Sequence, residues 1–487
     1  MRIKELLISA GVFDAAVFSG DDVEISSVVT DSRQITDGCC FIAVRGYTSD
    51  GHDYIADAVS GGASVVVCED DSSIPAGFPR AVVTDARSCG GPLAQAILHW
   101  PGRKLKIVAI TGTNGKTTVA YMIREILTAA GYKTGLIGTI EYDTGSGCED
   151  SVATTPDGVA LAAMMADMLD MGLTHLVMEV SSHALDQARV AGLDFAVGIY
   201  TNLSGDHLDY HETFEKYRSA KAKLFSQLGP DGRAVINRDD SEGDYMSASA
   251  PCPTVWYGLN LLADVRAKIQ QIAACGSAIQ VTTSAGEVDM LLPLIGRNNV
   301  YNALSAIAAC EVLGATPELS CRALSHMTLV PGRLQRVDSE APFDVFVDYA
   351  HTDDALVNVL SSLRPVTRGR LILVFGCGGD RDRTKRPRMA AVAQDLADVL
   401  IITADNPRNE EPMAIIDDML AGLDESGRSR CEVEPDRARA IAKSIFIARS
   451  GDVVLIAGKG HERFQIVGKE RIEFDDVATA FSMINDQ

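Results

Sequence analysis

The sequence lacks a C-x-x-C pair, a long apolar run and an excess of basic residues, and each absence excludes a class of protein. The 11 cysteines are odd in number and lie mostly in apolar segments, which indicates reduced core residues in a reducing cytoplasm. No apolar run approaches the ~18 residues that span a bilayer, and residues 1–11 show no signal-peptide core. A net charge of −22 argues against nucleic acid and anionic membranes as partners.

The length of the chain predicts several domains, because its 487 residues exceed what one core holds and suggest about three units of ~150 residues. Apolar residues make up 46% of the chain, as in a globular enzyme. Apolar strand-like runs alternate with helical patterns and predict an α/β fold. We expect a small N-terminal α/β domain (1–100), a central domain with a parallel sheet of the P-loop ATPase type (101–332), and a Rossmann-like C-terminal domain (333–487).

Residues 106–131 carry the most specific pattern, a buried strand followed by a glycine-bearing turn and an amphipathic helix. Glycines let the backbone approach an oxyanion, the helix N-terminus favours anions, and Lys116 adds a positive charge. The hydroxyl of Thr117 is the expected Mg²⁺ ligand. The alternative is a tight turn before an ordinary helix. The pattern predicts that ATP is bound by Gly112, Thr113, Asn114, Gly115, Lys116, Thr117 and Thr118.

Two further apolar runs end in polar residues, among them Glu179 and His207. The carboxyl ends of parallel strands share one edge of a sheet, so these groups are expected to face the phosphate loop and hold Mg²⁺. Asn299 and Asn302 lie three apart at a predicted helix start, where they could cap the helix or bind a nucleobase edge. The helical segment 217–225 contains Lys221, and its lysines are expected on a solvated face.

In the third region, arginines, carboxylates and amides follow the ends of several apolar runs. Arginine pairs with a carboxylate through two parallel hydrogen bonds, while Asp, Glu and Asn oxygens accept from an ammonium group. The segments 380–383, 405–408 and 458–462 therefore predict a site for a zwitterionic amino acid. The alternative is a salt-bridged surface.

The segments GTNGKTT, MEVSSH and TNLSGDHLDYH together resemble the Mur ligases, ATP-dependent enzymes that build the peptide stem of bacterial peptidoglycan. Folylpolyglutamate synthetases share the phosphate loop, so the loop alone does not distinguish the two families. The third-region segments GCGGDRD, DNPR and GKGHE are similar to those of the family members that add meso-2,6-diaminopimelate to UDP-N-acetylmuramoyl-L-alanyl-D-glutamate. The resemblance spans all three regions and implies those two substrates, ATP and Mg²⁺, and a cytoplasmic monomer.

The resemblance also implies a role for each matching position. The implied catalytic residues are Lys116, Glu179, His207 and Lys221, and the implied metal ligands are Thr117, Glu179, His207 and Lys221, the last carbamylated by CO₂. ATP would also contact Asn299, Arg333 and Asp348. The UDP-sugar dipeptide would be held by Ser32, Tyr47, Thr48, Ser49, Thr154, Thr155, Ser181, Gln187 and Arg189. Diaminopimelate would be held by Arg381, Asp405, Asn406, Pro407, Arg408, Gly458 and Glu462.

The implied reaction has two steps. ATP phosphorylates the side-chain carboxylate of the D-glutamate and leaves as ADP, and the neutral amine of the amino acid then displaces phosphate from the acyl phosphate to form an amide. Three residues depart from the family pattern, namely Gly205, Asn298 and Asp353. Two alternatives remain at this point: a lysine-adding or polyglutamate-adding ligase of the same superfamily, and a non-catalytic nucleotide sensor.

Overall fold

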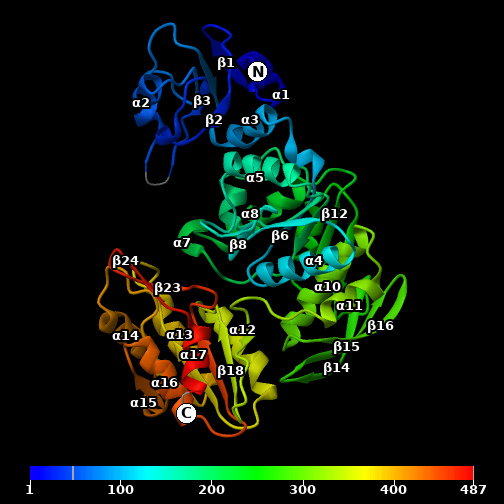
Figure 1. The fold of residues 1–487 in the computed structure, drawn as a ribbon, viewed down its shortest axis with the longest axis vertical. Helices are drawn as coiled ribbons and strands as arrows, with labels where there is room; N and C mark the ends of the chain where they lie inside the picture. The colour runs from blue at the N-terminus through cyan, green and yellow to red at the C-terminus, as the bar shows by residue number, and fades with distance from the viewer. Residues whose placement is uncertain (47–48, 486–487) are drawn as a thin grey trace. The chain divides into compact units, whose positions relative to one another are not determined.

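The computed structural model describes residues 1–46 and 49–485, which form two compact units. The first unit consists of Met1–Leu203, Thr213–Tyr257 and Ala308–Ala315, and the second of Ser204–Glu212, Gly258–Ile307 and Thr316–Gln487. Both units combine helices with sheets that are largely parallel, so the predicted mixed α/β class is confirmed (Figure 1). The predicted domain boundaries at residues 100 and 332 stay a prediction.

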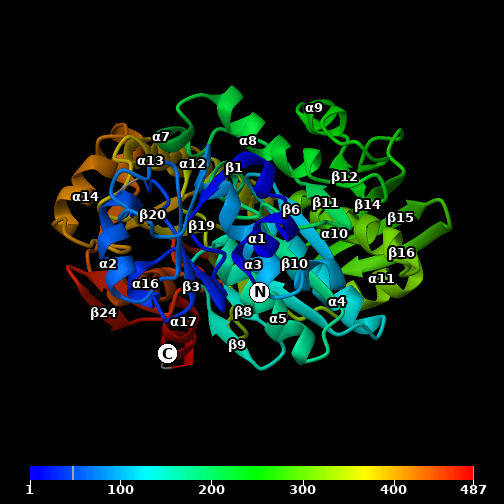
Figure 2. The same ribbon diagram turned by 90° about the horizontal axis from the view of Figure 1, so that it is seen from above.

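The N-terminal part of the first unit is a five-stranded sheet in the order β1-β5-β4-β3-β2. All of its pairs are parallel except β1 with β5. Figure 2 shows α1 and α3 side by side, and both contribute to one core with the sheet. The elements are β1 (Ala16–Ser19), β2 (Ser27–Val29), β3 (Cys39–Ile42), β4 (Val65–Cys68), β5 (Arg80–Val83), α1 (Ile3–Ser9), α2 (Ile55–Ser60) and α3 (Gly90–Ile97).

The rest of the first unit is built on strands in the order β13-β12-β11-β6-β10-β7-β8-β9, of which β13 to β7 are parallel. The central strand β6 is buried from its second residue onward, because helices cover both faces of the sheet. These strands are β6 (Lys106–Thr111), β7 (Thr134–Ile137), β8 (Glu141–Asp143), β9 (Cys148–Asp150), β10 (His175–Glu179), β11 (Val197–Tyr200), β12 (Arg233–Asn237) and β13 (Thr254–Gly258).

Alternate residues of β6 face different helices. Ile107 and Ala109 join a core with α5 and α8, while α4 packs against β6, β7 and β10. In register, Ile110 of β6 pairs with Glu179 and Thr111 with Tyr200, so three strands end together. The helices are α4 (Lys116–Ala129), α5 (Gly158–Asp170), α6 (Ser182–Asp186), α8 (Phe214–Ser226) and α9 (Gly243–Ala248).

The second unit contains an antiparallel meander and a six-stranded sheet in the order β17-β18-β22-β19-β20-β21. Only β17 is antiparallel to its neighbour in that sheet. The strands are β14 (Val265–Ala273), β15 (Gly276–Thr283), β16 (Gly286–Leu292), β17 (Gln335–Arg336), β18 (Asp344–Asp348), β19 (Leu371–Phe375), β20 (Val399–Ile402), β21 (Cys431–Val433), β22 (Val453–Ala457), β23 (Phe464–Val467) and β24 (Glu470–Glu473).

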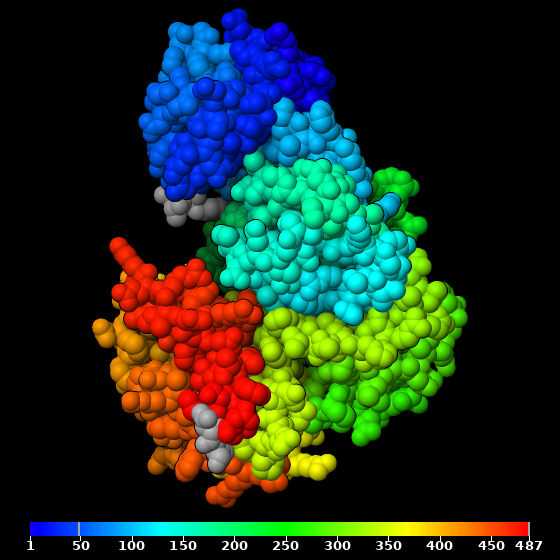
Figure 3. Space-filling model, viewed as in Figure 1, coloured from blue at the N-terminus to red at the C-terminus, as the bar shows by residue number. Residues whose placement is uncertain are grey.

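This six-stranded sheet has a core on each face. On β19, Leu371, Leu373 and Phe375 pack with α12, α13 and α14, whereas Ile372 and Val374 pack with α16 and α17. Figure 3 shows α17, in red, at the surface of the unit. The helices are α7 (Leu208–His211), α10 (Arg297–Val312), α11 (Pro317–Ser325), α12 (Asp353–Leu363), α13 (Lys385–Leu396), α14 (Pro412–Leu420), α15 (Glu425–Ser429), α16 (Arg437–Ile447) and α17 (Asp476–Asn485).

Candidate active site

The phosphate loop joins the end of β6 to the start of α4. Gly112 has a φ of +147°, and a Cβ there would lie 1.8 Å from the hydroxyl oxygen of Thr201, so only glycine fits. Lys116, the first residue of α4, donates from Nζ to the carbonyl oxygens of Gly112 (3.0 Å) and Thr113 (2.9 Å). Its charge thus lies over the loop, at the positive end of the helix dipole. This arrangement suits a bound phosphate.

Glu179 and Thr117 form the oxygen-rich part of the loop region. Glu179 is 1% exposed and accepts hydrogen bonds from Thr117 Oγ1 (3.0 Å), Thr139 N (2.8 Å) and Thr139 Oγ1 (3.0 Å). All three donors are neutral, and no described lysine, arginine or histidine forms an ion pair with this carboxylate. A buried carboxylate beside a hydroxyl, without a balancing cation, fits Mg²⁺.

Lys221 of α8 is directed at the same loop. It is 1% exposed, and its Nζ donates to the carbonyl oxygen of Gly112 (2.8 Å) and lies 4.4 Å from the ring centroid of Tyr217. The expectation of a solvated lysine face is therefore wrong for Lys221, whereas Lys223 is exposed and pairs with Asp186 (2.8 Å). The protein positions Lys221 against the loop because α8 packs its other buried side chains on β6.

The residues predicted to hold the muramoyl dipeptide form one hydrogen-bonded group in the first unit. Thr155 Oγ1 donates to the carbonyl oxygen of Glu179 (2.9 Å) and accepts from Ser181 N (3.1 Å). Arg189 donates from Nη1 to the Thr155 carbonyl oxygen (2.7 Å) and from Nε and Nη2 to Gln187 Oε1. Thr154 lies 3.1 Å from Thr139 across their hydroxyls, which brings this group next to Glu179.

The residues predicted for the uridine end are less connected. Ser32 begins a short 3-10 helix, and the backbone carbonyl of Ser49 accepts from Gly46 N (2.9 Å). Tyr47 and Thr48 lie outside the described residues.

His207 belongs to the second unit, unlike the other predicted metal ligands. It precedes α7 with a φ of +54°, and its backbone N donates to Asp206 Oδ1 (2.8 Å). In the described part of the chain, no cluster of three or more His, Cys, Asp or Glu side chains could hold a metal ion.

The predicted nucleotide residues Asn299, Arg333 and Asp348 also lie in the second unit. Asn299 Nδ2 donates to the carbonyl oxygen of Ile295 (2.9 Å), and its Oδ1 accepts from Asn302 (3.1 Å), so both amides bond within the start of α10. The guanidinium of Arg333 lies 4.8 Å from the ring centroid of Tyr349. Burial raises the pKa of Asp348, and the charge of Arg333 opposes that rise.

The amino-acid cluster comes from segments that follow β20 and β22. Lys459, 0% exposed, donates to Glu462 Oε2 (3.0 Å) and Asn406 Oδ1 (3.2 Å), and lies 3.8 Å from Asp405 Oδ1. Asn406 Nδ2 also donates to Glu462 Oε2 (2.8 Å). Asp405 Oδ1 is buried and accepts no hydrogen bond in the described part of the chain, which leaves an acceptor for an incoming donor.

The two predicted arginines differ. Arg408 is half-buried at a φ of +51°, and its Nη1 donates to the carbonyl oxygen of Gly379 (2.7 Å). Arg381 is exposed and has no hydrogen-bond or ion-pair partner among the described residues. Pro407 and Gly458 contribute backbone, and a Cβ on Gly458 would lie 3.4 Å from Asp405 Oδ2.

Sequence reasoning did not assign a role to Lys459. In the structure its buried ammonium donates to Asn406 and Glu462. These two side chains, which were predicted to accept from the ammonium of a substrate, therefore already accept one hydrogen bond each from Lys459. The signal in the sequence was that Lys459 lies between two glycines directly after an apolar segment, which forms a buried strand.

The three departures are accommodated locally. A side chain at Gly205 would meet open space, and Asn298 is exposed and lies 3.3 Å from Asn358. Asp353 is the first residue of α12, a position that suits aspartate because its charge complements the helix dipole.

The chain matches the Mur ligase catalytic domain over residues 24–99, the Mur ligase middle domain over 110–310 and the Mur ligase glutamate ligase domain over 332–460. In the described residues, no helix is long and apolar enough to cross a membrane.

Full-length relatives carry one name. The UDP-N-acetylmuramoyl-L-alanyl-D-glutamate--2,6-diaminopimelate ligase of Geobacillus thermodenitrificans is 43% identical over 477 residues, which cover 97% of each chain. The protein of that name from Geobacter sulfurreducens is 43% identical over 497 residues, 98% of this chain and 97% of its own. A solved structure with that name is 35% identical, covers 95% of both chains and has a TM-score of 0.69. The chain therefore belongs to the Mur ligase family.

Proposed function

We propose that this chain is an ATP-dependent ligase that adds meso-2,6-diaminopimelate to UDP-N-acetylmuramoyl-L-alanyl-D-glutamate in peptidoglycan precursor synthesis. The observation that carries the proposal is the 43% identity to ligases of that name over 97% of both chains. Such coverage includes the third region, which distinguishes diaminopimelate-adding members from other amide ligases. We further propose that the protein works in the cytoplasm as a monomer.

The first step needs a charge-stabilising site for phosphoryl transfer, and the phosphate loop suits it. Lys116 and the start of α4 would offset negative charge on the transferring phosphoryl group. Thr117 and Glu179 would hold Mg²⁺, with His207 and a carbamylated Lys221 as further proposed ligands, and the ion would supply positive charge against the phosphates. The group around Thr155 and Arg189 would hold the dipeptide whose carboxylate is phosphorylated, because it is hydrogen-bonded to the Glu179 strand end.

The second step needs an amino acid oriented with a neutral amine. Arg408 and Arg381 would bind the distal carboxylate of diaminopimelate, and Asp405, Asn406 and Glu462 would bind the distal ammonium group. The buried, unbonded Asp405 Oδ1 supports this assignment. Lysine lacks the distal carboxylate, so it would leave the arginines without that partner.

We also propose that Lys221 is carbamylated by CO₂. A carbamate would convert its cation into an anion with oxygen ligands, and the support for this proposal is the buried position of Lys221 beside the phosphate loop. Intact-protein mass spectrometry or ¹³C NMR under ¹³CO₂ should detect one carbamate that is absent from Lys221→Ala. A bare amine under saturating CO₂ would refute this proposal.

One assay tests the function as a whole. The protein is incubated with ATP, Mg²⁺ and UDP-N-acetylmuramoyl-L-alanyl-D-glutamate, and phosphate release is compared with meso-diaminopimelate, lysine and glutamate. We expect release and amide product with diaminopimelate far above the other two. A preference for lysine or glutamate would support another amide ligase of the superfamily, and no release with any of them would support a nucleotide sensor.

A further inference from the structure

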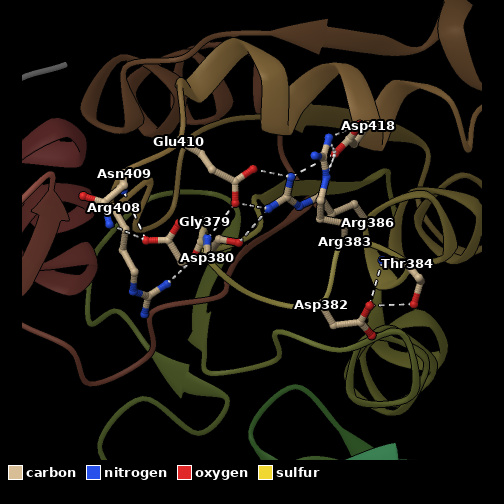
Figure 4. Close-up of polar contacts among 11 residues, drawn as sticks. Gly379, Asp380, Asp382, Arg383, Thr384, Arg386, Arg408, Asn409, Glu410 and Asp418 are labelled. Carbon is tan, nitrogen blue, oxygen red and sulfur yellow. Dashed lines mark hydrogen bonds and ion pairs between the residues drawn. The ribbon is translucent and has the colours of Figure 1, made fainter. Parts of the chain in front are cut away.

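A buried arginine lies beneath the predicted amino-acid site. Arg386 of α13 is 0% exposed, so it cannot touch a substrate. Its guanidinium holds Glu410 through two hydrogen bonds, from Nη1 to Oε2 (2.9 Å) and from Nη2 to Oε1 (2.7 Å), and its Nη1 also donates to Asp418 Oδ2 (2.9 Å) (Figure 4). Arg383 pairs with the same Asp418 (2.9 Å). A buried guanidinium is costly unless paired, and here two carboxylates pair with it.

Glu410 connects this arginine to the loop that follows β19. Its Oε1 accepts the backbone N–H of Asp380 (2.6 Å), and Arg386 Nη2 lies 3.4 Å from the carbonyl oxygen of Gly378. The segment 378–380 is therefore held at both ends by one charged pair. Arg381, a predicted ligand of the amino acid, follows this segment directly.

The same segment is bonded to the loop that follows β20. Gly379 N donates to the carbonyl oxygen of Asn406 (2.9 Å), and Arg408 Nη1 donates to the Gly379 carbonyl oxygen (2.7 Å). Asn409 Nδ2 donates to Asp380 Oδ2 (2.7 Å), as Figure 4 shows. The loop that carries Arg381 and the loop that carries Arg408 therefore hold each other in place.

Both loops also adopt backbone conformations that need support. Asp380 has a φ of +53° and Arg408 a φ of +51°, in the left-handed region that is unfavourable for a non-glycine residue. Such conformations persist only where surrounding contacts over-determine them. The contacts that hold them include those of Glu410 with Asp380 and of Arg408 with Gly379, and the backbone of Arg408 is also hydrogen-bonded to Ile466 and Gly468.

We propose that Arg386 is a positioning residue for the incoming amino acid: through Glu410 it fixes the loops that carry Arg381 and Arg408. Without Arg386, two carboxylates lose their shared cation, the Asp380 anchor shifts, and the two substrate arginines lose their common geometry. This inference rests on the proposed function for the identity of the substrate. It predicts a selective loss of amino-acid affinity, because the side-chain hydrogen bonds of Arg386 and Glu410 in the described residues go to each other, to Asp418 and to the loop after β19, and none goes to a predicted nucleotide residue.

The test uses Arg386→Lys, which keeps the charge but cannot pair with both oxygens of Glu410 and with Asp418. We expect the KM for meso-diaminopimelate to rise about tenfold or more, with the KM for ATP within about twofold of wild type. Arg370→Lys is the matched control, because Arg370 pairs with Asp452 (2.6 Å) at the opposite, amino end of the same sheet. That control should leave both KM values within about twofold.

A second readout does not depend on activity. Amide hydrogen exchange of residues 378–384 in the ligand-free protein should be faster in Arg386→Lys than in wild type and unchanged in Arg370→Lys. Should Arg386→Lys fail to fold, Glu410→Gln replaces it in both measurements, since the amide weakens the same two contacts. Unchanged exchange, an unchanged KM for the amino acid, or an equal rise for ATP would each overturn the positioning role. If wild-type protein does not use diaminopimelate as a substrate, only the proposed function is refuted. The comparison of amide hydrogen exchange would still decide the role of Arg386.

Discussion

The phosphate loop and the amino-acid cluster bind charged groups by different physical means. The loop is seven consecutive residues whose backbone, glycine conformations and helix dipole create the site. The cluster is assembled from side chains that follow three separate strands, and buried Arg386 and Lys459 hold it together. A site built from backbone should therefore lose function mainly when its own residues are substituted. A site built from side chains should also lose function when buried residues that never touch the substrate are substituted.

Lys116→Ala tests the loop most severely. We expect turnover to fall by a factor on the order of a hundred or more, because the substitution removes a strong electrostatic stabiliser of the transferring phosphoryl group. The measurement is kcat for phosphate release at saturating substrates. Lys443→Ala, which removes an exposed lysine paired with Glu432 (2.5 Å), is the control. Near-normal turnover in folded Lys116→Ala would remove the loop from the mechanism.

Gly112→Ala tests whether backbone geometry builds the loop. The new Cβ would overlap Thr201, so the loop must move, and we expect kcat/KM for ATP to fall on the order of tenfold to a hundredfold. Gly147→Ala is closely matched, since Gly147 has a φ of +138° but open space around its Cβ. It carries the same backbone strain without the overlap. Because Gly147 lies between β8 and β9, outside the loop, Gly147→Ala should leave kcat/KM for ATP near wild type, and equal losses in both variants would show that the loss does not arise in the loop.

The same difference explains what the sequence could predict. Residues 112–118 are contiguous, so their spacing alone indicates the turn, the helix start and the lysine that lies over the loop. The apolar runs before Glu179, Asp405 and Gly458 likewise predicted β10, β20 and β22, because strands buried on both faces read as continuous apolar segments.

Pairings between distant segments could not be read in this way. The burial of Lys221 depends on how α8 packs on β6, and helical spacing alone placed it on a solvated face. Arg386 and Glu410 are 24 residues apart, and no local pattern distinguishes their pairing from a surface ion pair. The short strand β24 consists mainly of charged residues and lacks the apolar signal of a strand.

Arg408→Ala tests the side-chain site at its predicted contact with substrate. We expect the KM for meso-diaminopimelate to rise roughly tenfold to a hundredfold, in line with about 1.5 to 3 kcal/mol for a charged hydrogen bond. Arg408 is half-buried, so the loss should be smaller than for a fully desolvated ion pair. The preference for diaminopimelate over lysine should narrow. Arg364→Ala, which breaks the Arg364–Asp398 pair (2.6 Å), is the control, and an intact preference in Arg408→Ala would assign the carboxylate elsewhere.

Glu410→Gln tests the smallest effect, the electrostatic support of the cluster. Hydrogen bonds from Arg386 and then from the Asp380 amide lower the pKa of Glu410 from 4.5 to about 2. Because the folded-state pKa is the lower one, the stabilisation is complete above about pH 4.5 and is lost as pH falls toward 2. We expect Glu410→Gln to cost on the order of 1 kcal/mol at neutral pH, a Tm decrease of roughly 2 to 4 °C, since partial exposure screens the pair.

The measurement is Tm as a function of pH for wild type and Glu410→Gln. The gap between them should be constant near neutral pH and should close between about pH 4.5 and 2, because protonated Glu410 resembles glutamine. Glu432→Gln, which removes a carboxylate paired with exposed Lys443, supplies the comparison for a surface charge. A gap that persists unchanged to pH 2 would mean that glutamine disturbs packing rather than charge. Arg386 and Glu410 would then position the loops through packing and not through charge.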